Sequence, residues 1–124
     1  MDSLNALSGK IIAGAIEVHK TLGPGLLESA YEEALCHELT LRRLAVERQK
    51  PVSIHYKGIH LNVTYRLDLV VNEAIVIELK ACAKIEPIHK AQLLTYLRVA
   101  KLPLGLLLNF NQVVLKEGIV RLRL

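Results

Sequence analysis

The stretch that decides the fold is Tyr65-Arg-Leu-Asp-Leu-Val-Val-Asn-Glu-Ala-Ile-Val-Ile-Glu-Leu-Lys80. Two apolar, β-branched segments flank Asn72-Glu73-Ala74, and this pattern predicts two strands joined by a short turn. Asp68, Glu78 and Lys80 interrupt these segments with charge. Burying a charged side chain is costly unless a partner or a metal compensates for its lost hydration. The placement therefore predicts a functional site.

Strand geometry predicts which of these charges meet. Side chains alternate between the two faces of a strand, so Glu78 and Lys80 should point the same way. In an antiparallel hairpin centred on Glu73, Asp68 falls opposite Glu78, because both are five residues from the centre. Along the first strand, we expect residues 61, 63, 65, 67 and 69 on one face and residues 62, 64, 66 and 68 on the other.

Two facing carboxylates and a nearby ammonium suggest a specific chemistry. The carboxylates repel each other, and a hard divalent cation with oxygen ligands relieves that repulsion. The ammonium can orient or activate a water, or stabilise charge on a phosphate in transit. Asp68, Glu78 and Lys80 therefore form a candidate site for phosphodiester hydrolysis.

Outward from this stretch, the apolar pattern predicts an α/β fold with a mixed sheet. Helices are expected at residues 3–22, 26–43 and 87–101, where apolar residues recur every three or four positions. Strands are expected at residues 46–56, 59–71, 75–80 and 102–110, with a terminal hairpin within residues 113–124. Pro51 favours an edge position or a bulge for the first strand. The helix before the last long strand allows that strand to return parallel to an earlier one.

Length and composition indicate one domain, residues 1–124, with an aliphatic core. Hydrophobic residues make up 52% of the chain, and mean hydropathy is +0.31. This apolar content favours a homo-oligomer, in which a second copy covers part of the surface. The net charge of +4 and the pI near 9.2 permit a polyanion partner and equally describe a mildly basic, solvated surface.

Sequence features also bear on the compartment. Cys36 and Cys82 lack metal-type spacing and are expected to be free, buried or partly buried thiols in a reducing compartment. The N-terminal residues show no secretion signal, and no apolar run approaches the roughly 18 residues that span a bilayer. We expect a cytoplasmic protein that does not act at a membrane.

Two motifs resemble a known family. Asp68 followed by Glu78-Leu79-Lys80 resembles the signature of the PD-(D/E)XK nuclease superfamily, with Leu67 where the name has a proline. Gly25-Leu-Leu-Glu28-Ser-Ala-Tyr31 matches the motif that names the GxxExxY proteins, which are similar to that superfamily. Further similar segments lie at residues 7–12, 16–19, 87–89 and 92–97.

The resemblance implies a restriction-endonuclease-like α-β-β-β-α-β core, here preceded by one extra helix. It implies that Asp68 and Glu78 bind Mg²⁺ or Mn²⁺ with the Leu79 carbonyl as a further ligand, and that Lys80 positions the attacking water. The remaining implied roles are a third metal-binding acid at Glu28 and contacts to Lys80 or the substrate phosphate from Gln92 and Tyr96.

Each of the outer residues also has a structural interpretation. Glu28, near a helix start, can simply favour the positive end of the helix dipole. Gln92 and Tyr96 lie four residues apart on one helix face and can be ordinary surface packing. His19 is either a ligand or phosphate contact or a partly exposed helix residue.

Three classes of function follow. The first is a metal-dependent nuclease acting on DNA or RNA, which the intact motif residues favour. The second is a nucleic-acid-binding or regulatory protein that does not cut. The third is a self-assembling structural protein in which Asp68, Glu78 and Lys80 form an ion-pair cluster, which the apolar content and small size favour.

Overall fold

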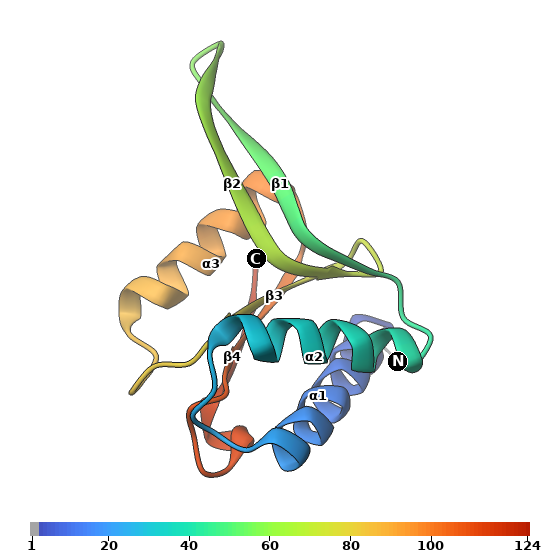
Figure 1. Ribbon diagram of the computed structural model, residues 1–124. Coiled ribbons are helices and arrows are strands. Elements are labelled where there is room, and N and C mark those ends of the chain that lie inside the picture. The colour runs from blue at the N-terminus through green and yellow to red at the C-terminus, as the bar shows by residue number, and fades with distance from the viewer. Residues whose placement is uncertain (1–2) are drawn as a thin grey trace.

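The structure is a computed structural model that describes residues 3–124 (Figure 1). Its elements, in chain order, are α1 (Ser3–Leu22), α2 (Glu28–Leu41), β1 (Val46–Tyr56), β2 (Ile59–Val71), β3 (Ile75–Lys80), α3 (Pro87–Ala100), β4 (Leu104–Asn109), the 3₁₀ helix η1 (Leu115–Gly118) and β5 (Ile119–Arg123). None of the helices in this range is long and apolar enough to cross a membrane.

The five strands form one mixed sheet in the order β1-β2-β3-β4-β5. Neighbouring strands are antiparallel except β3 and β4, which are parallel. A parallel pair needs a crossover, and α3 provides it. This arrangement confirms the predicted α/β class. β1 lies at an edge and its register shifts between Ser53 and His55, in agreement with the prediction from Pro51.

The helices cover opposite faces of the sheet. Helices α1 and α2 pack on one face, where Ile11, Leu35 and Leu39 meet strand residues such as Ile77. Helix α3 covers the other face, where Leu93 and Leu97 meet strand residues such as Val76. All six residues of β4 are buried, as expected for a strand covered on both faces. Figure 1 shows α3 and the α1–α2 pair on different sides of the sheet.

The C-terminal segment differs from the expected hairpin within residues 113–124. Val113 and Val114 are exposed and belong to no strand, and residues 115–118 form a 3₁₀ helix. β5 pairs instead with β4, from Leu104 opposite Arg123 to Leu108 opposite Ile119. The reason is that β4, without β5, would leave a row of buried backbone donors and acceptors unpaired.

The β1–β2 hairpin bends where β2 reaches Asp68. Gln49 on β1, between the pairs Arg48–Leu69 and Lys50–Leu67, has a positive φ of 55°. Leu69 packs on the α1–α2 side, but Leu67 packs on the α3 side. The prediction that residues 61–69 keep one alternation was therefore wrong: the change of face lies opposite the left-handed residue Gln49 of the partner strand.

Candidate functional site

β2 and β3 separate at the predicted site. Their ladder runs from Val71–Ile75 to Leu69–Ile77, which confirms the hairpin centre at Glu73. The next pair in this register would be Asp68 and Glu78, but the two strands no longer pair there. The Asp68 carboxylate fills the gap and accepts a hydrogen bond of 2.9 Å from the backbone N–H of Leu79. This contact fixes the carboxylate at the opening between the two strands.

Glu78 and Lys80 lie on the face of the sheet that α3 covers. Ile77 and Leu79 pack against α1 and α2, whereas Val76 packs against α3. Because side chains alternate along β3, Glu78 and Lys80 point away from the face of Ile77 and Leu79. They share the face of Val76. Glu78 and Lys80 therefore share one face of the sheet, as strand alternation predicts.

Glu78 is the most perturbed ionisable group of this site. Its side chain is 8% exposed, and its Oε1 is buried without a hydrogen-bond partner. Burial raises the pKa of Glu78 to about 9, and the negative charge of Asp68 adds to the rise, while the Lys80 ammonium acts in the opposite direction. With this pKa the carboxyl is mostly protonated at neutral pH when no metal is bound, and a bound cation would favour its ionised form.

The Leu79 carbonyl faces the same gap as Asp68. In a strand, the N–H and C=O groups of one residue point toward the same neighbouring strand. The Leu79 N–H points toward Asp68, while the Lys80 carbonyl accepts a 2.9 Å hydrogen bond from the Phe110 N–H on the β4 side. Carboxyl oxygens of Asp68 and Glu78 and the backbone carbonyl of Leu79 thus lie around one opening.

Helix α3 brings Tyr96 to the acids. Burial raises the pKa of the Tyr96 phenol, and the charges of Glu78, Tyr65 and Asp68 raise it further. The Tyr96 ring lies 6.3 Å from the ring of Tyr65, measured between centroids. Gln92 lies one helical turn earlier and is exposed. Tyr96 therefore lies close to the acids, whereas the roles of Tyr96 and Gln92 stay predictions.

A comparison with protein families identifies the superfamily of this chain. Residues 5–122 match the family described as the PD-(D/E)XK nuclease superfamily. The chain belongs to the PD-(D/E)XK nuclease superfamily. A comparison with curated proteins gave no match. Among solved structures, the chain is similar to one titled "Crystal structure of SSO0001", with 25% identity and a TM-score of 0.44 over 76% of this chain. The match spans 50% of the length of that chain.

Glu28 occupies a separate place in this PD-(D/E)XK domain. It is the exposed first residue of α2, and with Leu26, Leu27 and Ser29 it borders a hollow that Ala81 closes. Among residues 3–124, no three His, Cys, Asp or Glu side chains are grouped closely enough to hold an ion. Glu28 therefore does not join Asp68 and Glu78 in this arrangement, and its role as a third acid stays a prediction.

The sequence analysis missed Asn109 as a support of the site. Asn109 is fully buried beside Lys80 in the β3–β4 register. Its amide donates to the Cys82 carbonyl at 3.0 Å and accepts from the Cys82 N–H at 3.2 Å. These bonds hold the chain just after Lys80. The available signal was a polar residue near the end of the apolar run 102–110.

The tyrosine of the GxxExxY-like motif has a structural role. Tyr31 is fully buried and stacks on Phe110, with 4.5 Å between ring centroids. Its hydroxyl donates to the Gly23 carbonyl at 2.5 Å and accepts from the Leu26 N–H at 3.0 Å. Tyr31 thus fastens the α1–α2 connection to the core, on the face of the sheet opposite Lys80.

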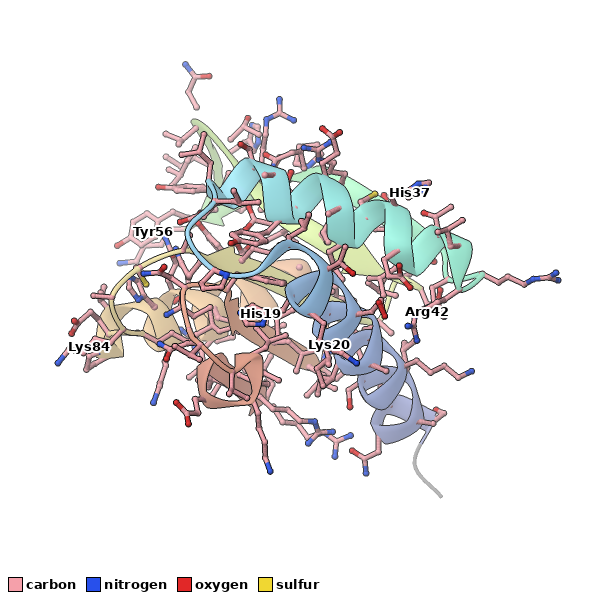
Figure 2. The ribbon with its side chains drawn as sticks, turned by 60° about the horizontal axis from the view of Figure 1, so that its bottom comes forward. His19, Lys20, His37, Arg42, Tyr56 and Lys84 are labelled. Carbon is pink, nitrogen blue, oxygen red and sulfur yellow. The ribbon has the colours of Figure 1, made fainter. Side chains whose placement is uncertain are left out.

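His19 supports the same region. It is only 6% exposed, so the expectation of a partly exposed residue was wrong. Its Nε2 lies 2.7 Å from the carbonyl oxygen of Gln112, and Figure 2 shows the ring between α1 and the C-terminal part of the chain. Since that carbonyl must accept, the Nε2 carries the proton in this contact. His19 joins two segments and lies apart from the acids.

We predict that Tyr31→Phe destabilises the domain by about 1–3 kcal/mol, because the substitution removes two hydrogen bonds, one to the Gly23 carbonyl and one from the Leu26 N–H. Urea unfolding measures this difference. The matched control is Tyr56→Phe, which removes the same hydroxyl from a ring that is 57% exposed and should change stability little. Equal effects of the two substitutions would contradict the role assigned to Tyr31.

Proposed function

We propose that this domain is a nuclease that hydrolyses phosphodiester bonds in DNA or RNA with Mg²⁺ or Mn²⁺. The observation that carries the proposal is the buried Glu78 carboxyl, whose Oε1 has no hydrogen-bond partner, beside the Asp68 carboxylate. A protein rarely leaves such an oxygen unsatisfied without a functional reason. Membership in the PD-(D/E)XK nuclease superfamily supports the same activity.

The donor set fits a hard divalent cation. Asp68, Glu78 and the Leu79 carbonyl offer only oxygen atoms, which Mg²⁺ and Mn²⁺ prefer. The unpartnered oxygen of Glu78 is a ready ligand, and ionisation of this buried group requires a nearby positive charge. When bound, the cation lowers the pKa of a coordinated water and neutralises charge on the phosphate.

The other residues act on the water and the phosphate. Lys80 shares the face of Glu78, and its ammonium positions the attacking water or stabilises charge in the transition state. The Tyr96 hydroxyl lies close to the acids. It donates a hydrogen bond to the water that Lys80 positions or to a substrate phosphate oxygen. Gln92, which is exposed one helical turn before Tyr96, contacts Lys80 or the substrate phosphate.

Isothermal calorimetry with Mg²⁺ tests the metal site directly. We expect binding to release about one proton at pH 7, because Glu78 is protonated without metal and must ionise to become a ligand. Titrations in two buffers of different ionisation enthalpy measure that proton. The melting temperature should rise with Mg²⁺ or Mn²⁺. A melting temperature indifferent to millimolar concentrations of both ions would count against the site.

We also propose that the protein forms a homo-oligomer through β5. This strand ends the sheet, and the apolar residues Val113, Val114 and Leu124 are exposed near it. A strand at the edge of a sheet can pair with the same strand of a second copy. Light scattering at tens of micromolar protein should show a dimer, and Leu124→Asp should weaken it. A wild-type monomer at that concentration would refute this proposal.

A further inference from the structure

The outer part of the β1–β2 hairpin projects far beyond the rest of the molecule (Figure 1). We call residues 53–66 the arm: they comprise the end of β1, the turn Lys57-Gly58 and the start of β2. No residue of the arm is buried. A lone two-stranded ribbon adds little to the stability of a fold. The core therefore does not explain why both strands extend this far.

The arm carries basic side chains and no acidic ones. Residues 48–67 contain no Asp or Glu, although the chain has 12 acids. Lys57 stands at the tip, with its ammonium 5.4 Å from the centre of the Tyr56 ring. His55 and His60 lie side by side, with 5.0 Å between ring centroids. Arg66 lies at the base of the arm and donates to the Gln49 carbonyl. This surface suits a polyanion.

The shape of the arm suits a groove of double-helical DNA. The major groove of B-form DNA admits a two-stranded β-ribbon, whereas the deep groove of A-form RNA does not. The turn consists of two residues, Lys57 and Gly58. Both have a positive φ, 47° and 88°, as the tightest hairpin turns require. Exposed apolar side chains at the tip, Tyr56 and Ile59, can pack on sugars and base edges.

The arm starts next to the candidate site. Arg66 precedes Asp68 by two residues, and Tyr65 contacts Tyr96 across the α3 face. A duplex held by the arm would therefore run toward Asp68, Glu78 and Lys80. We propose that the arm inserts into the groove of double-stranded DNA and delivers the adjoining backbone to these residues. The delivery step rests on the proposed nuclease function, whereas the binding step does not.

Binding of a fluorescein-labelled DNA duplex, measured by anisotropy in EDTA, tests the arm without any cleavage. Lys57→Glu should weaken binding about tenfold and lower the slope of log K against log salt by about one or more, because a phosphate contact is lost and a repulsion is added. The matched control is Lys20→Glu on α1, an equal charge change at an exposed lysine far from Tyr56 (Figure 2). It should retain most of the affinity.

A shortened arm gives a second test. Residues 54–63 are replaced by Asn-Gly, which keeps the pair Ser53–Thr64 and removes no buried side chain. Unchanged circular dichroism and Mg²⁺ binding, with most duplex affinity lost, would support the proposal. Equal losses in Lys57→Glu and Lys20→Glu would overturn it, because binding would then follow net charge alone.

Other outcomes separate the arm from the nuclease. Tighter binding of single-stranded DNA or duplex RNA than of duplex DNA would overturn the groove assignment. A dimer that becomes monomeric on shortening the arm, with duplex affinity unchanged, would make the arm a contact between copies. Asp68→Ala should lose Mg²⁺ binding but keep duplex affinity in EDTA. If Asp68→Ala and the wild type both bind the duplex, and neither cuts it when Mg²⁺ or Mn²⁺ is added, the proposal for the arm is supported and the nuclease proposal is contradicted.

Discussion

Lys80→Ala should reduce metal-dependent cleavage by about a thousandfold while leaving Mg²⁺ binding largely intact. Lys80 supplies positive charge on the face of Glu78, and in the proposed mechanism it acts on water or on transition-state charge and is not a metal ligand. The assay incubates single- and double-stranded DNA and RNA with Mg²⁺ or Mn²⁺ and measures products. Lys20→Ala, an exposed lysine on α1, is the control and should cut like the wild type.

Asp68→Ala, in the same assay, should lose both cleavage and metal binding. The substitution removes an anionic ligand and also the acceptor of the Leu79 N–H. Cleavage that survives in Lys80→Ala would indicate a contaminant or a different site. Salt-dependent nucleic-acid binding without any product would favour a non-cutting binding protein. If the wild type neither binds nor cuts, the self-assembling structural protein becomes the better interpretation.

Glu78→Gln should stabilise the metal-free domain at neutral and alkaline pH. The pKa of Glu78 is about 9 in the folded protein, against 4.5 for an ordinary glutamate. The folded state therefore binds the proton more tightly than the unfolded state, and this contribution to stability is complete below pH 4.5 and decreases as pH rises toward 9. Glutamine stays neutral throughout, so the variant should gain on the order of 3 kcal/mol over wild type at pH 7 relative to pH 4.5.

Urea unfolding in EDTA at pH 4.5, 7 and 9 measures this dependence. The difference between variant and wild type should grow with pH and level off above about 9. Mg²⁺ should stabilise the wild type, because it binds the ionised carboxylate, and should have less effect on Glu78→Gln. A difference that is independent of pH would show that Glu78 ionises normally in the folded protein.

The local sequence pattern predicted much of the fold. Helix α1 and strands β1 and β2 have the predicted bounds, and helices α2 and α3 lie within the predicted ranges. The register of β2 and β3 followed from the short turn at Glu73, since a hairpin turn sets the pairing of both strands. These features depend on residues close together in sequence, which is why periodicity reveals them.

Features that depend on distant residues escaped prediction. The change of face between Leu67 and Leu69 lies opposite Gln49, a left-handed residue on the neighbouring strand, and the alternating pattern of residues 61–69 does not reveal it. Asn109 reaches Cys82 across 27 positions, and β5 joins β4 because that edge of the sheet was unpaired. For the site, sequence spacing placed Asp68, Glu78 and Lys80 together. It gave no way to see that Glu28 begins a helix packed on the opposite face.

The position of the Asp68 carboxylate does not depend on how far the β1–β2 hairpin extends beyond Gln49. Asp68 is fixed by its bond to Leu79 and by the β3 register, both on the core side of Gln49. Residues added or removed in equal number on both strands beyond this point would move the tip and leave the acids in place. We therefore expect the hairpin to accept such insertions without displacement of the Asp68 and Glu78 carboxyl groups.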